Sequence, residues 1–222
     1  MPYAALLLDF YGTLVEEDDP IIARIAGEVA IHSPMAPDAR EVGSRWWELM
    51  GGMVGAAYGT AFRLQREIEL DSLAQLLGEF QANLDPLALS QPIFDNWQRP
   101  RAYYDAVALI EHSPLPVCIV SNIDDVDLQA ALAHLGWRVP LVVTSEACRA
   151  YKPRAEMFEA ALHLLGVAPD QALHVGDSIS SDVVGAQCAG MDVGWVNRRG
   201  RKAPNPAPTH VISSLGDLLE LL

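Results

Sequence analysis

The chain has 222 residues, half of them apolar, and a formal net charge of −14 at pH 7. This length and composition are typical of a globular protein with a sizeable core, and they exclude a disordered chain. The acidic balance excludes a general nucleic-acid-binding surface, which would be basic. It leaves a phosphate-bearing small molecule open as a partner, because a local cation outweighs the distant field.

The three cysteines, Cys118, Cys148 and Cys188, lie in or beside apolar segments. An odd number of such cysteines indicates reduced thiols in an intracellular protein. The N-terminus lacks a basic start followed by an apolar signal core, and no apolar run approaches ~18 residues. We therefore expect a cytoplasmic, soluble protein without membrane contact.

Six short apolar runs have strand character. They cover residues 4–9, 116–121, 141–145, 172–176, 192–197 and 209–213. After residue 100, helical spacing covers 102–112, 125–135, 154–165, 180–190 and 215–221. Because strands that alternate with helices are joined by right-handed crossovers, this order predicts an α/β fold. Its Rossmann-like, mostly parallel sheet would carry helices on both faces.

Residues 16–97 interrupt this alternation, since they contain no convincing strand. Pro20 suits the first turn of a helix, which Asp18 or Asp19 would cap. Further helical patterns cover residues 40–50 and 61–80, with breaks near Gly51-Gly52 and Tyr58-Gly59. The sequence thus predicts a helical insertion directly after the first strand.

Several apolar runs end in residues with reactive or charged side chains. They are Asp9, Ser121 and Asp177. Two further candidates are Lys152, which precedes an amphipathic stretch, and Asp182, five residues after Asp177. A buried carboxylate is costly without a partner or a metal, so an acid at a strand end suggests a chemical role. In an open α/β sheet the carboxyl ends of the strands converge on one crevice, where these side chains would meet. A capping Asp, a capping Ser and a surface Lys are the alternative interpretations of each residue alone.

The order and context of these residues resemble the four motifs of the haloacid dehalogenase-like (HAD) superfamily of hydrolases. The matching segments are Leu8-Asp9-Phe10-Tyr11-Gly12-Thr13-Leu14, Val120-Ser121-Asn122, Tyr151-Lys152-Pro153 and Val175-Gly176-Asp177-Ser178 with Asp182. The motifs run through nearly the whole chain, and four in order make coincidence improbable. The resemblance implies an α-helical cap domain at residues 16–97, inserted into a HAD-like core made of residues 1–15 and 98–222.

The resemblance also assigns catalytic roles. Asp9 matches the nucleophile, whose carboxylate forms a covalent intermediate that water later hydrolyses. Ser121 matches the hydroxyl that holds a phosphate oxygen, and Lys152 matches the cation that steadies Asp9 and the transferred group. Thr13 and Asn122 would support the loop or line the substrate pocket.

A metal site follows from the same resemblance. Asp177 matches the family's metal-binding acid, and Asp182 matches the second acid, which assists the metal directly or through water. Asp9 and the backbone carbonyl of Tyr11 would complete the ligands. Such oxygen-only ligation suits Mg²⁺.

Two motifs depart from the pattern in opposite directions. Tyr11 stands where the family's phosphatases usually carry a second Asp that protonates the leaving oxygen, and Tyr at this position is what 2-haloacid dehalogenases show. Asp177, by contrast, is typical of the metal-dependent enzymes, since the dehalogenases lack an acid there. Those dehalogenases also use a Tyr where this chain has Phe158, and a cap Arg for which Arg40 and Arg45 are weak candidates.

Asp177 decides between these possibilities. Without a cation its carboxylate would repel that of Asp9 by one to several kcal/mol, an order-of-magnitude estimate for charges a few ångströms apart. We therefore expect a Mg²⁺-dependent phosphatase that acts on a small phosphorylated metabolite through an aspartyl-phosphate on Asp9. Tyr11 is a candidate proton donor, or only lines the pocket. The alternatives are a metal-free 2-haloacid dehalogenase and a catalytically weak relative with a binding role.

The remaining conspicuous residues have plainer interpretations. The basic, proline-rich stretch from Arg198 onward is predicted to be a solvated loop. At least one of Trp46 and Trp47 is expected to pack in the core of the insertion. His163 and His174 lack metal-ligand spacing and are predicted to be structural.

Overall fold

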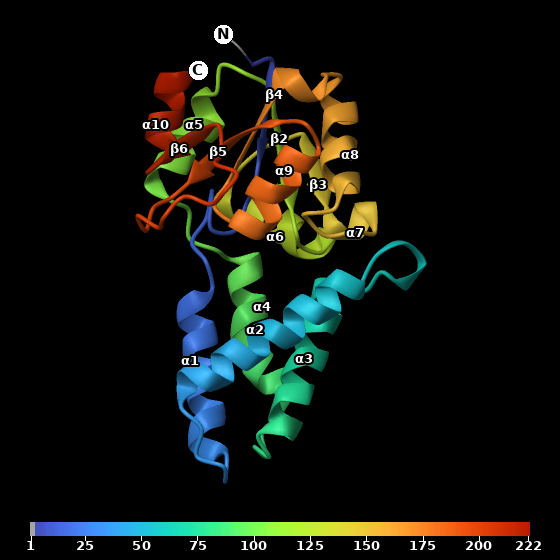
Figure 1. Ribbon diagram of the computed structural model, residues 1–222, viewed down its shortest axis with the longest axis vertical. Helices are drawn as coiled ribbons and strands as arrows, with labels where there is room; N and C mark the ends of the chain where they lie inside the picture. Colours follow the sequence, from blue (N-terminus) through green and yellow to red (C-terminus); the bar gives the residue numbers. More distant parts are fainter. Residues whose placement is uncertain (1–2) are drawn as a thin grey trace.

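The computed structural model describes residues 3–222, with a six-stranded parallel sheet at one end and a group of helices at the other (Figure 1). The strands are β1 (Ala5–Leu8), β2 (Val117–Ser121), β3 (Leu141–Thr144), β4 (Ala172–Gly176), β5 (Asp192–Val196) and β6 (His210–Ile212). Their order across the sheet is β3-β2-β1-β4-β5-β6, and all neighbouring pairs are parallel. The six predicted strands and the α/β fold are confirmed.

Strand β1 lies inside the sheet, because it pairs with β2 on one side and β4 on the other. Leu8 is in register with Ile119 of β2 and with Val175 of β4. All four residues of β1 are buried, as expected for a central parallel strand covered on both faces. The carboxyl end of β1, where Asp9 follows, is therefore flanked by the carboxyl ends of two neighbouring strands.

The side chains of β1 alternate between two apolar layers. Leu6 and Leu8 join one layer, and Leu7 joins the other. Among the helices that follow residue 100, those that contribute to the first layer are α5 (Tyr104–His112), α6 (Asp125–Leu135) and α10 (Leu215–Leu221). Those of the second are α8 (Ala155–Leu165) and α9 (Val184–Cys188), which a π-helical turn at Ile179–Val183 precedes. The predicted core helices are confirmed, whereas α7 (Ser145–Cys148) was not predicted.

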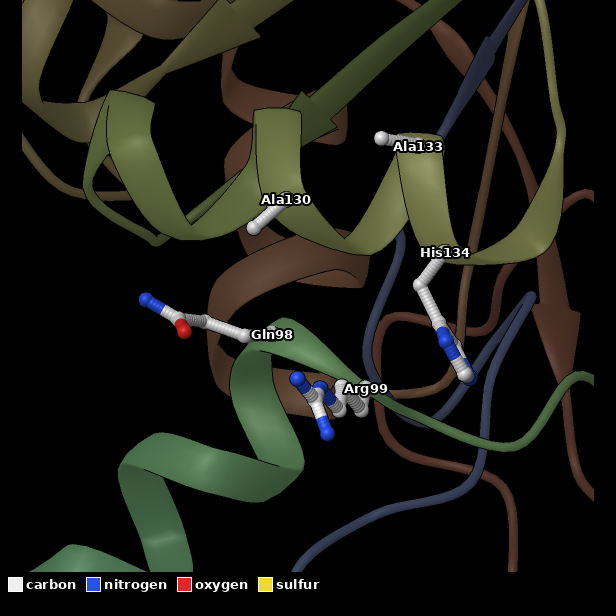
Figure 2. Close-up of a pocket in the computed structure, with 5 residues that line it drawn as sticks. All are labelled: Gln98, Arg99, Ala130, Ala133 and His134. Carbon is white, nitrogen blue, oxygen red and sulfur yellow. The ribbon is translucent and has the colours of Figure 1, made fainter.

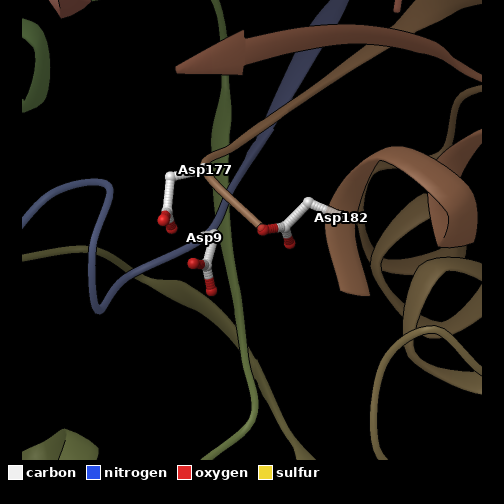
Figure 3. Close-up of side chains that lie close together, drawn as sticks. All are labelled: Asp9, Asp177 and Asp182. Atoms are coloured by element: carbon white, nitrogen blue, oxygen red, sulfur yellow. The ribbon is translucent and has the colours of Figure 1, made fainter. Parts of the chain in front are cut away.

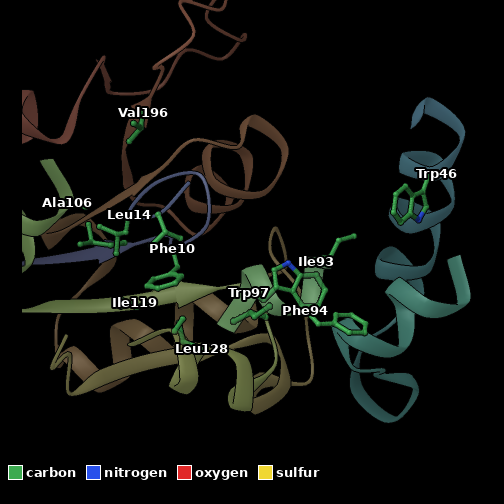
Figure 4. Packing of buried hydrophobic residues seen from close by; sticks show 14 of the residues in the cluster. Phe10, Leu14, Trp46, Ile93, Phe94, Trp97, Ala106, Ile119, Leu128 and Val196 are labelled. Carbon is green, nitrogen blue, oxygen red and sulfur yellow. The ribbon is translucent and has the colours of Figure 1, made fainter. Parts of the chain in front are cut away.

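Four helices between β1 and α5 form the inserted region, which lies beyond the carboxyl ends of the strands in Figure 1. They are α1 (Asp19–His32), α2 (Ala39–Ala56), α3 (Gln65–Glu79) and α4 (Pro86–Gln98). Trp46 of α2 is buried and donates a hydrogen bond to Ser72 Oγ of α3. Figure 4 shows Phe94 and Trp97 of α4 between the sheet and Trp46. The expected core role of Trp46 is confirmed, and one apolar cluster joins both regions.

Two details of the inserted region correct the sequence-based expectation. A break near Gly51-Gly52 was wrong, because α2 continues to Ala56. Both glycines are exposed, and the packed residues of α2 outweigh the helix penalty of about 1 kcal/mol for each. Asp18 occupies the N-cap position of α1, but it does not cap the helix and instead accepts a hydrogen bond from Trp97 Nε1 at 3.0 Å.

Carboxylates of the sheet region hold the start of α3. Asp124 accepts hydrogen bonds from the backbone amides of Gln65 and Arg66, at 2.7 and 3.1 Å. The Arg66 guanidinium in turn donates two hydrogen bonds to Asp127, at 2.6 and 2.7 Å. These are the amides that a helix N-terminus leaves unpaired, and an anion is favourable there. Helix α3 is thus anchored to the region that carries the sheet.

The basic segment after β5 forms a loop, as predicted, but it is not simply solvated. Its arginines bind acceptors near the strand ends: Asp105 for Arg198, Glu17 and Asp19 for Arg199, and the carbonyl of Asp177 for Arg201. The loop therefore connects the sheet to the segment that enters α1.

The boundaries proposed for a separate cap domain, 16–97, stay a prediction. Within residues 3–222, none of the helices combines enough length with enough apolar character to cross a bilayer.

Candidate active site

Three carboxylates meet at the carboxyl edge of the sheet. Asp9 follows β1, Asp177 follows β4, and Asp182 belongs to the π-helical turn. Each offers an oxygen, and these oxygens all lie within 4.8 Å of one another (Figure 3). Figure 3 shows the acids coming from three separate segments toward one point. The strand order brings together residues that are distant in the sequence.

Two glycines allow this close approach. Gly12 has a φ of +85°, and a Cβ placed there would lie 2.5 Å from Asp177 Oδ1. A side chain at Gly176 would collide with the carboxyl group of Asp182. The turn after β1 therefore needs glycine for backbone geometry and for space, and the end of β4 needs it for space alone.

Lys152 lies between two of the acids and is almost completely buried. Its Nζ donates hydrogen bonds to Asp9 Oδ1 at 2.6 Å and to Asp182 Oδ1 at 2.7 Å. Burial alone would lower the pKa of Lys152, but the two carboxylates raise it, so the amine stays charged. The pairing orients one oxygen of Asp9 and leaves its other oxygen free of the lysine.

The three acids do not share one protonation behaviour. Burial, together with the charge of Asp182, raises the pKa of Asp9, and burial with the charge of Asp9 raises that of Asp177. The pKa of Asp182 is instead lowered, because Lys152 and a hydrogen bond with His174 outweigh its burial. The surroundings thus favour the ionised form of Asp182, whereas Asp9 and Asp177 each disfavour the ionised form of the other.

The donor set between Asp9 and Asp177 fits a divalent cation. Two carboxylates that raise each other's pKa are relieved by a positive charge, and oxygen donors suit Mg²⁺. Asp182 is less available as a ligand, because Lys152 and His174 contact its Oδ1 and the Ser178 amide donates to its Oδ2 at 3.0 Å. Its contacts indicate an acid that holds Lys152 in place.

Asn122 lies beside Lys152 and clamps its backbone. The side-chain amide of Asn122 donates to the Lys152 carbonyl at 3.1 Å and accepts from the Lys152 amide at 2.7 Å. Asn122 also lines the cavity described below. Ser121, the last residue of β2, is buried one position earlier. The hydroxyl of Thr13 lies 3.5 Å from Asp9 Oδ2 and 3.4 Å from Asp177 Oδ1, so it bridges the two acids.

The surroundings of the Tyr11 phenol do not favour a role as proton donor. Its hydroxyl donates a hydrogen bond of 2.5 Å to the backbone carbonyl of Trp97. Burial, followed by the charges of Asp127 and Asp18, raises the pKa of Tyr11 well above its usual value. A buried phenol with a raised pKa is a poor acid at neutral pH.

A cavity of about 410 Å³ lies between this edge and the inserted helices. Its floor includes Tyr11, Asn122 and Lys152, and its walls include Trp47 and other apolar residues of α2. A second cavity, between the end of α4 and helix α6, is lined by Gln98, Arg99, Ala130, Ala133 and His134 (Figure 2). The first cavity is lined by Lys152, which donates hydrogen bonds to Asp9 and Asp182. The described residues that line the second cavity include none that contacts the three acids, so the first cavity is the candidate active site.

Sequence patterns did not indicate how two residues, His174 and Glu69, contribute to this site. His174, predicted to be structural, is buried in β4, and its Nε2 lies 2.9 Å from Asp182 Oδ1. A lone polar residue in an apolar strand was the available signal. Glu69 of α3 also lines the cavity, and its position four and seven residues before Leu73 and Leu76, on the apolar face of the helix, was the available signal.

The comparisons with known proteins agree with this arrangement. A family model for haloacid dehalogenase-like hydrolases matches residues 3–190. The chain therefore belongs to the haloacid dehalogenase-like hydrolases, and the predicted resemblance is confirmed.

Individual relatives represent two kinds of chemistry. The (S)-2-haloacid dehalogenase H-109 of Pseudomonas putida is 27% identical over 121 residues, which are 53% of this chain and 54% of that protein. The pyrimidine 5'-nucleotidase YjjG of Escherichia coli (strain K12) is 38% identical over 99 residues, 42% of this chain and 44% of that protein. The matches thus span only about half the length of these relatives.

A solved structure is similar over the whole fold. The L-2-haloacid dehalogenase from Xanthobacter autotrophicus superposes with a TM-score of 0.75 at 25% identity and covers 99% of this chain and 98% of that one. Membership of the family identifies the chain as a hydrolase, and the relatives named above include both dehalogenases and a nucleotidase.

Proposed function

We propose that this protein is a Mg²⁺-dependent phosphatase that hydrolyses a small phosphate monoester through an aspartyl-phosphate on Asp9. The observation that carries the proposal is the carboxylate of Asp177 beside that of Asp9. A dehalogenase has no use for an acid there, because it would repel the nucleophile and the carboxylate of the substrate. A phosphatase uses it to hold the cation that offsets the charge of the phosphoryl group.

Asp9 would attack phosphorus with the oxygen that Lys152 does not hold. The bond from that oxygen to phosphorus forms while the ester P–O bond breaks, and the alkoxide leaves. Water then attacks phosphorus, which releases inorganic phosphate and regenerates Asp9. Bound Mg²⁺, held by Asp9, Asp177 and the Tyr11 carbonyl, would neutralise charge on the phosphoryl oxygens.

Other residues would position the phosphoryl group. Lys152 neutralises Asp9 and the transferred group, and Ser121 donates a hydrogen bond to a phosphoryl oxygen. Asp182 keeps Lys152 charged and in place. Tyr11 contributes its carbonyl, while its phenol is engaged with Trp97. The leaving oxygen then takes its proton from water or from the substrate, which predicts slow turnover on poor leaving groups.

The second candidate is a 2-haloacid dehalogenase, favoured by Tyr11 in the first motif. The dehalogenases of the family bind halide through a cap arginine. Arg45 instead pairs with Glu79 and Glu48, and Arg40 is exposed. Among the described residues that line the cavity, none is an arginine. A binding role without turnover is the third candidate.

Three measurements separate the three candidates. We expect phosphate release from p-nitrophenyl phosphate with Mg²⁺ and none after chelation with EDTA. Chloride release from 2-chloropropionate in EDTA would establish the dehalogenase instead. Failure on broad panels of phosphate esters and haloacids, together with a stable partner in pull-downs, would favour the binding role.

A further inference from the structure

The cavity above the catalytic edge contains a second, separate acidic feature. Glu69 of α3 lines this cavity, is only 2% exposed, and lies on the buried face of its helix. Its Oε1 has no hydrogen-bond partner within residues 3–222. Asp18 lines the same cavity and is close enough to raise the pKa of Glu69 through its charge.

A buried carboxyl oxygen without a partner is costly and rare in folded proteins. Other buried acids of this chain have partners: Asp127 has Arg66, and Asp182 has Lys152. Glu69 also makes no contact that explains it as a helix cap, since it lies inside α3. A group that is unsatisfied in the free protein and faces a cavity is suited to bind a ligand group there.

The charge of the cavity indicates the chemistry of that ligand group. Among the described lining residues, Lys152 is the single lysine or arginine, and Asp9 and Asp182 already neutralise it. Asp18 and Glu69 therefore face the cavity without a balancing cation. The other walls near them, including Ile22, are apolar, as a hydrocarbon segment requires.

We propose that Glu69, supported by Asp18, binds a protonated amine on the substrate, so that the preferred substrates are aminoalkyl phosphate monoesters. This inference rests on the proposed phosphatase activity. The phosphate would bind at Asp9 and Lys152, and the ammonium group would bind at the wall formed by α1 and α3. Burial and the charge of Asp18 raise the pKa of Glu69 to about 8, and a bound ammonium group would favour its ionised form.

The test compares three substrates of similar size: 3-aminopropyl phosphate, butyl phosphate and 3-hydroxypropyl phosphate. An ammonium group and a methyl group are nearly isosteric, so the first two differ mainly in charge. We expect kcat/KM for 3-aminopropyl phosphate to exceed that for butyl phosphate by at least about tenfold, the range for one charge-assisted hydrogen bond. The preference should shrink to about one in Glu69→Gln, which keeps the shape of the side chain.

Two controls keep the result interpretable. Glu41→Gln makes the same change at an exposed position of α2 and should retain the wild-type preference. Asp18→Asn, which can still accept from Trp97, should reduce the preference partially and replaces Glu69→Gln if that variant does not fold. Thermal unfolding of each variant checks its fold.

The outcomes separate the two proposals. Equal rates on the amine and the butyl ester, with p-nitrophenyl phosphate hydrolysed in Mg²⁺, would overturn the amine site and leave the phosphatase intact. A preference for 3-hydroxypropyl phosphate would also overturn it, because Glu69 would then act as a neutral hydrogen-bonding group. Absence of any phosphate hydrolysis would remove the phosphatase proposal and this inference with it.

Discussion

The edge of the sheet and the inserted helices handle buried charge in opposite ways. At the edge, Asp182 is paired with Lys152, and Asp9 has both the lysine and the hydroxyl of Thr13. In the inserted helices, Glu69 is buried with an oxygen that has no partner within residues 3–222. The edge is organised before substrate arrives, as catalysis requires. In the inserted helices Oε1 of Glu69 lacks a hydrogen-bond partner among the described residues, as expected where a bound ligand would supply one.

The largest expected effect lies at the edge. Asp9→Asn removes the nucleophile of both candidate reactions, so turnover of phosphate esters should fall by at least about 10⁴-fold. Phosphate release measured with Mg²⁺ checks this, and Asp170→Asn, at an exposed position, is the matched control. Substantial remaining activity in Asp9→Asn would mean that another group attacks the substrate.

Asp177→Asn tests the metal-dependent reaction separately, because it removes a negative charge that the metal-free reaction does not need. Phosphate release at millimolar Mg²⁺ should fall about 100-fold, and more Mg²⁺ should recover part of it. The measurement is a Mg²⁺ titration of the initial rate in the wild type and the variant. Identical titration curves would be incompatible with Asp177 as a ligand.

The free energy of unfolding should depend on pH because Glu69 is buried with an oxygen that has no partner among the described residues. The pKa of Glu69 is raised from 4.5 to about 8, so the folded state binds more protons than the unfolded state between these values. The protonated form of Glu69 therefore makes its full contribution to the free energy of unfolding below about pH 4.5. That contribution is lost as the pH rises toward about 8. Relative to wild type, Glu69→Gln should gain about 1 kcal/mol at pH 5 and about 3 kcal/mol at pH 7, an order-of-magnitude expectation.

Urea unfolding of both proteins at several pH values measures this difference directly. Glu41→Gln should follow the wild-type curve throughout. Parallel curves for the wild type and Glu69→Gln would mean that Glu69 is ionised in the folded protein without penalty, and the contrast between the two regions would disappear.

The smallest expected effect concerns the contact between the two regions. Tyr11→Phe removes the hydrogen bond to the Trp97 carbonyl and should lower stability by about 1 kcal/mol. Turnover should change less than about tenfold, because the phenol is not the proton donor in the proposed reaction. Rates on p-nitrophenyl phosphate and on an alkyl phosphate check this. A loss confined to the alkyl ester would restore Tyr11 as the acid.

The sheet could be predicted because its signals are local. Each strand is a short apolar run between turn signals, and the ends of β1, β2 and β4 carry the polar residues that meet at the edge. The parallel arrangement then followed from the rules for α/β folds, whereas the order of the strands comes from the structure. The short motifs around Asp9 and Asp177 were sufficient to indicate which side chains converge.

The substrate wall could not be predicted in this way. Glu69 shares a face of α3 with Leu73 and Leu76, but whether an acid on that face is buried depends on how α3 packs against α2 and α4. Trp46 and Trp47 are adjacent, yet one is buried and the other is 70% exposed at the cavity. Such differences depend on tertiary packing and not on local propensity.

The position of β1 inside the sheet has a consequence for synthesis. Ala5 is in register with Ala172, and Asp9 takes its lysine from 143 positions further along the chain. As translation proceeds from the N-terminus, the emerging polypeptide carries Asp9 long before Lys152, which pairs with it in the folded protein. Pairings between such remote segments are also slow to form. A nascent chain shorter than 182 residues therefore holds Asp9 without the complete group of three acids, and the cluster can assemble only late in synthesis.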